Sequence, residues 1–187
     1  GADIREVSRA IGADSRIGSK FLDSGPGFGG SCFKKDILNL VYLSKHFGLV
    51  EVANFWEVVV SLNNWHQHRI SRLVVKNLFG TVTGKKICIL GFAFKANTND
   101  TRESPAINIC LDLLEEGAML KIYDPRVKSN QIEEEIAKNK DKNINYEGQW
   151  IKVESIYDSF NEADAIIVLT EWKEFQNLNW EEISSLM

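Results

Sequence analysis

The sequence is short of the residues that mark several common protein classes. Its 187 residues include only three cysteines, three prolines and three histidines, and 22 basic residues face 26 acidic ones. An odd number of cysteines without C-x-x-C spacing excludes a disulfide framework and a cysteine-based zinc site. A formal charge of -4 with no basic run gives no electrostatic reason to expect a nucleic acid or an anionic membrane as partner.

Long apolar runs are absent as well. No stretch resembles a signal peptide and none is long enough to span a bilayer, so we expect a cytoplasmic protein with free thiols. Hydrophobic residues still make up 44% of the composition, enough for a buried core in one or two domains. Because the sequence starts with Gly-Ala-Asp and stops within a helical pattern, we expect it to be a piece of a larger protein.

Residues 1–80 show helical patterns around a glycine-rich loop. Asp3 is placed to cap a short first helix, and a second helix is predicted over Lys34–Phe47. A third helical pattern runs from Glu51 to Phe79 and would extend about 40 Å. So long a helix indicates a spine between domains or a subunit contact. We therefore assign residues 1–80 to a central helical segment.

Residues 81–187 alternate apolar runs with helical patterns. Strands are predicted at Ile87–Leu90, Leu120–Tyr123 and Ala165–Leu169, with a weaker one at Ile151–Val153. Helices are predicted at Pro105–Glu116, Gln131–Lys138 and Ser155–Glu162. This alternation predicts an α/β domain with a doubly wound, Rossmann-like parallel sheet. Because such sheets bind ligands beyond the carboxyl ends of their strands, a site is expected within Gly91–Glu103.

The loop SGPGFGG, residues 24–30, contains a literal match to the dinucleotide fingerprint G-x-G-x-x-G. The match fails on context, because no convincing strand precedes the loop and no strand follows the next helix. The glycines instead allow the backbone to approach a ligand and to turn into a helix. Cys32 is then expected at the helix entrance, where free N–H groups and the charges of Lys34 and Lys35 favour a thiolate.

Lys35 lies three residues after Cys32 and Asp36 lies four residues after it. A nucleophile, an acid and a base can therefore share one helix face. A structural alternative stays open at this point. Most cysteines are small buried hydrophobes, and an Asp in a first helical turn often only complements the helix dipole. We expect Cys88 and Cys110, which have apolar neighbours, to lie in the core.

Two long segments carry a family resemblance. The segment GFGGSCFKKD, residues 27–36, resembles the active-site segment of the UDP-glucose/GDP-mannose dehydrogenase family, in its UDP-glucose 6-dehydrogenase branch. The segment GFAFKANTNDTRESP, residues 91–105, is similar to that family's second signature. Shorter matches fall in the family's order at DSRIG (14–18), YDP (123–125) and TEW (170–172). The likeness covers essentially the whole chain, as the family's central and carboxyl-terminal portion.

The resemblance implies an enzyme that oxidises UDP-glucose to UDP-glucuronate with two NAD⁺, through an aldehyde, a cysteine thiohemiacetal and a thioester that water hydrolyses. It implies that Cys32 is the nucleophile and that Asp36 takes part in proton transfer or water activation. Lys35 would lie beside the cofactor and the reacting centre. The residues implied to line the NAD site are Cys32, Phe33, Lys34, Lys35 and Arg102.

The resemblance also implies a set of UDP-glucose-binding residues. Arg16 would reach the substrate of a neighbouring subunit, Phe33 would pack near the uracil, and Phe94 and Lys95 would hold UDP-glucose from the second domain. The loop implied to wrap the sugar nucleotide consists of Asp23, Ser24, Gly25, Pro26, Gly27, Phe28 and Gly29. Asp23 departs from the lysine of some members, which leaves its side chain without an implied role.

Positive charge supports part of this set independently, since Lys95 and Arg102 offer cations to phosphates at the carboxyl end of a strand. Ser104 followed by Pro105 is typical of a helix N-cap and first helical residue.

The long helix matches the family's inter-domain spine, which also builds the dimer. A homo-oligomer is therefore implied, a dimer through this helix or a larger assembly such as a hexamer. The family's amino-terminal NAD-binding domain and a carboxyl-terminal strand with a further arginine fall outside the sequence. We accordingly expect the chain alone not to turn over UDP-glucose.

The histidines give no metal signal. His66 and His68 lie two positions apart, so they point to different helix faces and make a poor metal pair. With His46 they are interpreted as solvent or interface histidines, and Trp56 and Trp65 as core or dimer contacts.

Alternatives remain open inside and outside the family. UDP-N-acetylmannosamine dehydrogenases tend to have His at the position of Ser31 and lack the Lys-Asp pair, and GDP-mannose dehydrogenases usually have Leu at the position of Phe33. Both comparisons favour UDP-glucose. A non-catalytic assembly module with an inert Cys32 is the alternative of another class. A thiol acyltransferase or hydrolase lacks support, because no histidine has a context that suggests a base for Cys32.

Overall fold

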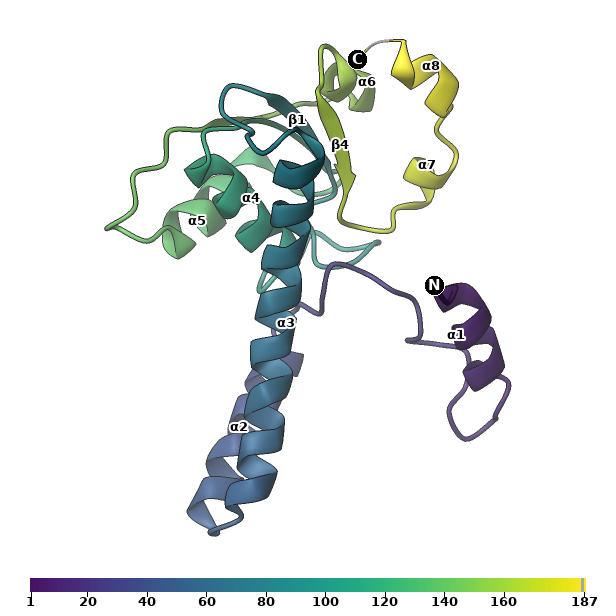
Figure 1. Cartoon of the computed structure of the whole chain (residues 1–187), viewed down its shortest axis with the longest axis vertical. Helices are drawn as coiled ribbons and strands as arrows, with labels where there is room; N and C mark the ends of the chain where they lie inside the picture. The colour runs from purple at the N-terminus through teal and green to yellow at the C-terminus, as the bar shows by residue number, and fades with distance from the viewer. Residues whose placement is uncertain (186) are drawn as a thin grey trace.

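The computed structural model describes residues 1–185 and 187 and consists of a helical half and a sheet-containing half joined by one long helix (Figure 1). The helical half contains α1 (Ile4–Gly12), α2 (Phe33–His46) and α3 (Val50–Asn77). The other half contains β1 (Lys86–Leu90), α4 (Pro105–Glu115), β2 (Met119–Tyr123), α5 (Ser129–Asn139), β3 (Gln149–Lys152), α6 (Ile156–Phe160) and β4 (Ala165–Val168). Two short helices follow, α7 (Lys173–Gln176), which the sequence patterns did not predict, and α8 (Trp180–Ser184), which lies in the helical pattern near the end of the sequence.

Within the described residues, four strands form a parallel sheet in the order β3-β2-β1-β4. Successive side chains of a strand point to opposite faces, so β1 contributes to two cores. Ile87 and Ile89 pack with buried residues of α4 and α5, whereas Cys88 and Leu90 pack with Phe160 of α6 and with residues of α7 and α8. Helices therefore cover both faces of the sheet (Figure 1). The prediction of a doubly wound, Rossmann-like α/β fold is confirmed.

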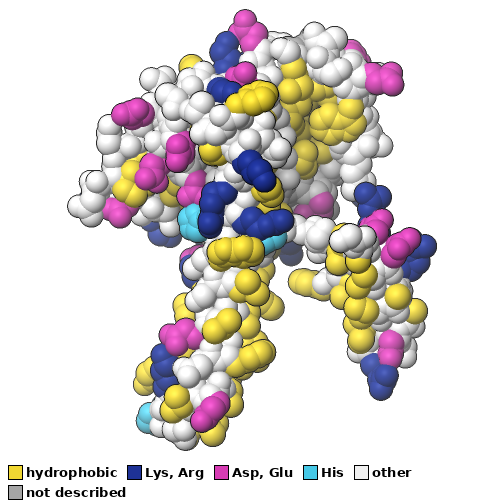
Figure 2. Space-filling model, viewed as in Figure 1, with side chains coloured by type: hydrophobic (Ala, Val, Ile, Leu, Met, Phe, Trp, Pro, Cys, Tyr) yellow, Lys and Arg dark blue, Asp and Glu magenta, His cyan; other side chains and the backbone are white. Residues whose placement is uncertain are grey.

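The spine helix α3 has 28 residues and starts one residue earlier and ends two residues earlier than the sequence pattern predicted. Its first part forms a hairpin with α2, and its last part packs against the sheet domain through Ile70 and Val74 (Figure 1). The α2–α3 hairpin exposes many apolar side chains, which Figure 2 shows as yellow patches along it. Among the described helices, none combines the length and apolar character needed to cross a membrane.

Helix α1 lies apart from the rest of the molecule (Figure 1). Asp3 caps it as predicted, since its Oδ1 accepts a hydrogen bond from the Arg5 N–H at 2.8 Å. None of its own residues is buried, and Ile4, Val7 and Ile11 expose an apolar stripe. Helical spacing of these three residues predicts one contact face, which α1 presents to solvent in the isolated chain.

Candidate functional site

Cys32 lies at the entrance of α2, and its side chain is exposed. The Asp36 N–H donates to the Cys32 carbonyl at 2.8 Å, which closes the first helical turn and places the two residues one turn apart. Lys35 and Asp36 are exposed beside it. The Ser31 Oγ lies 3.7 Å from the Cys32 Sγ. The structure thus gathers the three proposed catalytic side chains at an open helix N-terminus, where unpaired N–H groups favour negative charge.

The loop before Cys32 packs against the loop that follows β1. A Cβ at Gly29 would lie 2.4 Å from the carbonyl oxygen of Glu103, and one at Gly30 would lie 2.9 Å from the Phe94 ring. The Gly30 N–H also donates to the Arg102 carbonyl at 3.0 Å. The glycines are therefore needed for close contact between two loops far apart in sequence. This contact brings together the two segments singled out from the sequence.

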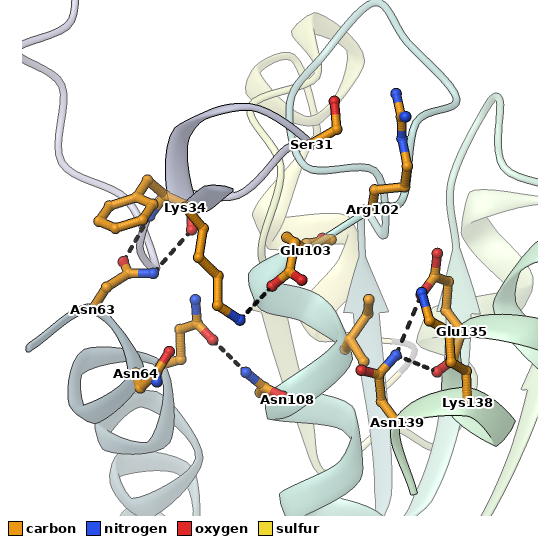
Figure 3. Close-up of a pocket in the computed structure, with 14 residues that line it drawn as sticks. Ser31, Lys34, Asn63, Asn64, Arg102, Glu103, Asn108, Glu135, Lys138 and Asn139 are labelled. Atoms are coloured by element: carbon orange, nitrogen blue, oxygen red, sulfur yellow. Dashed lines mark hydrogen bonds and ion pairs between the residues drawn. The ribbon is translucent and has the colours of Figure 1, made fainter. Parts of the chain in front are cut away.

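The spine helix holds the opposite side of the glycine loop. The Asn63 Oδ1 accepts from the Phe28 N–H at 2.9 Å, and the Asn63 Nδ2 donates to the Phe28 carbonyl at 3.0 Å (Figure 3). The His66 Nε2 lies 3.0 Å from the Gly25 carbonyl oxygen. His66, interpreted from the sequence as a solvent or interface histidine, is half-buried and also contacts the glycine loop. A single Asn or His on a helix gave no signal for this role.

The His68 side chain is 45% exposed and also makes a contact within the chain. Its Nδ1 lies 2.9 and 2.8 Å from the two carboxylate oxygens of Asp112 on α4. One residue earlier, the Gln67 Oε1 accepts a hydrogen bond from the Asn108 Nδ2 at 2.6 Å. Together these contacts fasten the middle of α3 to α4.

Charged groups of both loops lie around this contact. The Lys34 Nζ pairs with Glu103 at 2.7 Å, and Arg102 makes a two-pronged contact with Asp100 at 2.9 and 2.7 Å (Figure 3 labels all but Asp100). The hydrogen bond from Arg102 is the main cause that holds the pKa of the Asp100 carboxyl below its ordinary value. The pKa of Arg102 is raised, first by Asp100 and more weakly by the charge of Cys32. Lys34 and Arg102 are therefore each paired with a carboxylate.

A polar cleft of about 230 Å³ lies beside these loops, between α3, the start of α4 and α5 (Figure 3). Ser31, Lys34 and Arg102 line one part of it, and Glu135 and Lys138 of α5 line another. Cys32 is the next residue after the cleft-lining Ser31. The cleft thus contains positive and negative side chains as well as a helix N-terminus. Such groups can hold a polar ligand with phosphates.

The remaining residues implied by the resemblance occupy the two loops. Phe33 packs edge-on against Phe28 with ring centroids 4.8 Å apart, and the Lys95 Nζ lies over the Phe94 ring at 5.2 Å. Arg16 lies in the turn after α1, paired with Asp14 and 87% exposed. Asp23 and Ser24, in the segment between α1 and α2, are exposed, and Pro26 in the same segment is half-buried.

A buried carboxylate holds the loop after β1. The Asp124 Oδ2 accepts from the N–H groups of Phe92 and Ala93 at 2.8 and 3.0 Å. Its Oδ1 accepts from the N–H groups of Arg126 and Val127 at 2.9 and 3.0 Å. In dinucleotide-binding folds an acidic residue closing the second strand binds a ribose. Here that position, directly after β2, is occupied by contacts to the backbone.

The comparisons with known proteins agree with this geometry. The UDP-glucose/GDP-mannose dehydrogenase family models match residues 1–65 (central domain) and residues 88–187 (UDP binding domain). UDP-glucose 6-dehydrogenases of Caenorhabditis elegans and Drosophila melanogaster are 48% and 46% identical over 189 residues, which cover 100% of this chain and 39% and 40% of the relatives.

A UDP-glucose dehydrogenase structure from the archaeon Pyrobaculum islandicum has a TM-score of 0.79 at 31% identity, covering 96% of this chain and 38% of that one. The chain thus spans about two-fifths of the length of these relatives. More than half of its residues match the UDP binding domain model alone. The chain belongs to the UDP-glucose/GDP-mannose dehydrogenase family.

Proposed function

We propose that this chain supplies the central and UDP-binding parts of an enzyme that oxidises UDP-glucose to UDP-glucuronate. The observation that carries the proposal is the contact between the Cys32 loop and the loop after β1, through Gly29, Gly30 and Arg102. It places an exposed thiol at a helix entrance beside a guanidinium, next to a polar cleft. The identity of 46–48% to relatives named UDP-glucose 6-dehydrogenase supports the substrate.

In the proposed reaction the chain acts on C6 of the sugar after the alcohol has become an aldehyde. The Cys32 Sγ forms a bond to C6, and the carbonyl oxygen gains a proton to give a thiohemiacetal. Loss of a hydride from C6 and of the hydroxyl proton turns the adduct into a thioester. Asp36 accepts a proton from the attacking water, and cleavage of the C–S bond releases UDP-glucuronate and the Cys32 thiol.

NAD⁺ is the proposed cofactor, and two molecules bound in succession would each supply the acceptor for one hydride. The chain's own residues fit one edge of such a site, because Lys35 is exposed three residues after Cys32 and Arg102 is 63% exposed in its pair with Asp100. Lys34 is engaged with Glu103, so its proposed contact with the cofactor requires this exposed pair to open. The loop from Asp23 to Gly29, with Phe33, Phe94 and Lys95, is proposed to hold UDP-glucose.

The assembly is proposed to be a homodimer through the α2–α3 hairpin, or a larger oligomer built from it. Phe55, Val58 and Leu62 on α3 are each at least 60% exposed, which is unusual for three large apolar side chains on one element. We further propose that Arg16 serves the neighbouring subunit and that the enzyme acts in the cytoplasm.

The test uses the full-length parent enzyme with Cys32→Ser and, as control, Cys110→Ala in the sheet domain core. UDP-glucuronate formation is expected to fall more than about a hundredfold in Cys32→Ser, because a serine hydroxyl is a much weaker nucleophile at neutral pH. Folded Cys110→Ala should keep its activity. Unchanged UDP-glucuronate output from Cys32→Ser would remove Cys32 from the reaction. Comparing UDP-glucose with GDP-mannose and UDP-N-acetylmannosamine as substrates tests the sugar specificity.

A further inference from the structure

We propose that Asn63 is a positioning residue that fixes the glycine loop in the shape that receives the sugar nucleotide. The inference rests on the proposed function, in which residues 23–29 wrap around UDP-glucose. Asn63 itself belongs to the spine helix and acts through the loop backbone.

The first support is the pairing of one side chain with both backbone groups of one residue. The Asn63 amide accepts from the Phe28 N–H at 2.9 Å and donates to the Phe28 carbonyl at 3.0 Å. An amide is suited to this contact, because it carries a donor and an acceptor side by side. A carboxylate or an aliphatic side chain of the same size satisfies at most one of the two backbone groups. The contact therefore fixes the orientation of the peptide groups at Phe28 as well as their position.

The second support is the closeness of the loop to the helix. Gly27 has a φ of +129°, and a Cβ there would lie 2.7 Å from the Asn63 Oδ1 and 3.3 Å from the Gln67 Cγ. The loop backbone thus approaches α3 more closely than a residue with a side chain allows. The absence of a Cβ at Gly27 leaves the space that the Asn63 side chain occupies. The loop backbone turns next to the residue that the Asn63 amide holds.

The third support is the rigidity of the helix at this level. One turn after Asn63, Gln67 is only 3% exposed and bonds to Asn108 of α4 at 2.6 Å. The amide that holds the loop is therefore anchored to the UDP-binding half of the chain. At the other end of the loop, Gly30 is held separately by the Arg102 carbonyl. Loss of the Asn63 contacts should free residues 26–28, between the His66 contact at Gly25 and the Arg102 contact at Gly30, while leaving Cys32 in place.

The neighbouring residue provides a matched control. Asn64 is half-buried like Asn63 and lines the same cleft (Figure 3). In the part of the chain that the structure describes, no hydrogen bond joins the Asn64 side chain to the glycine loop. Asn63→Ala and Asn64→Ala remove the same atoms from adjacent positions, and only the first removes loop contacts.

The experiment compares both variants in the full-length enzyme by hydrogen–deuterium exchange of loop peptides and by steady-state kinetics. Asn63→Ala should speed exchange in residues 24–29 and raise KM for UDP-glucose about tenfold, the effect of losing two ordinary hydrogen bonds. KM for NAD⁺ should stay within about twofold, and kcat should change less than KM. Asn64→Ala should leave the loop exchange near that of the wild type, because the change removes no contact to the loop backbone.

A second variant guards against misfolding of the first. Asn63→Asp keeps the size and the acceptor oxygen but replaces the N–H donor by a carboxylate oxygen that faces the Phe28 carbonyl, so it should also speed loop exchange and raise KM for UDP-glucose. Unchanged exchange and KM in folded Asn63 variants, or an equal increase of loop exchange in Asn64→Ala, would overturn the inference. Absence of UDP-glucose turnover in the wild-type enzyme would contradict the proposed function instead, and the exchange of the loop would still decide whether Asn63 holds it.

Discussion

Gly29 faces the carbonyl oxygen of Glu103 so closely that an added Cβ would lie 2.4 Å from it. Because the obstructing atom belongs to the backbone, neither loop can relieve the overlap by turning a side chain. Gly29→Ala is therefore expected to destabilise the protein by about 1–3 kcal/mol, the usual cost of forcing extra atoms into a packed contact. Urea unfolding measures the loss.

Gly25 supplies the control in the same loop, since a Cβ there meets no heavy atom within 4 Å. Gly25→Ala should change the free energy of unfolding by no more than about 0.5 kcal/mol. Equal losses in the two variants would show that the contact between the two loops is not what restricts Gly29.

Asp124 gives the largest stability prediction. Its buried carboxylate accepts four backbone N–H groups, and Asp124→Ala would leave those donors without their partner. The expected loss is about 3 kcal/mol or more in the free energy of unfolding. Asp124→Asn should fall between the wild type and Ala, because one acceptor oxygen remains.

Asp141 is a suitable comparison for Asp124, since it also accepts a backbone N–H but lies in an exposed loop. Asp141→Ala should cost at most about 1 kcal/mol, because water can replace the lost acceptor. Chemical denaturation of the variants decides the matter. Similar losses for both Ala substitutions would contradict the importance of burial at Asp124.

The three thiols should differ strongly in reactivity. Burial raises the pKa of Cys88 to about 12, and burial likewise raises the pKa of Cys110, whereas Cys32 is exposed. At pH 8 only about one Cys88 in ten thousand would be a thiolate, and the thiolate is the species that reacts. Iodoacetamide should therefore modify Cys32 at least about a hundredfold faster in the folded protein, as peptide mass spectrometry can measure. Three equally slow thiols would favour the non-catalytic assembly module.

Local patterns predicted much of this fold. Ser104 and Pro105 located the start of α4 to the residue, because capping depends on neighbours in the chain. The bounds of α3 were predicted within two residues from hydrophobic spacing and a following glycine.

The contacts that shape the candidate site were not predicted, because they join distant segments. Asn63 meets Phe28 across 35 positions, and His66 meets Gly25 across 41. Asp124 meets Ala93 across 31 positions. A polar residue on a helix or after a strand carries no local sign of such a partner. Local patterns singled out each loop separately and the family resemblance assigned both to one site, and the structure shows the two loops in contact.

The pair formed by Asp100 and Arg102 predicts a pH dependence on the acid side. Arg102 lowers the pKa of the Asp100 carboxyl in the folded chain, whereas in the unfolded chain this pKa has its ordinary value of about 3.9. At a pH between these two pKa values the unfolded chain therefore binds more protons than the folded chain. The pair's contribution to stability is therefore fully present when the pH is above the pKa of the unfolded chain. It is lost as the pH falls through the lower pKa of the folded chain. Asp100→Asn removes the titrating group and should be less stable than the wild type at pH 7. Because the Arg102 side chain is 63% exposed and solvent screens the pair, the difference should be small. Denaturation between pH 7 and pH 2 should show the two stability curves converging in acid, whereas a constant offset at every pH would mean that the carboxylate charge contributes nothing.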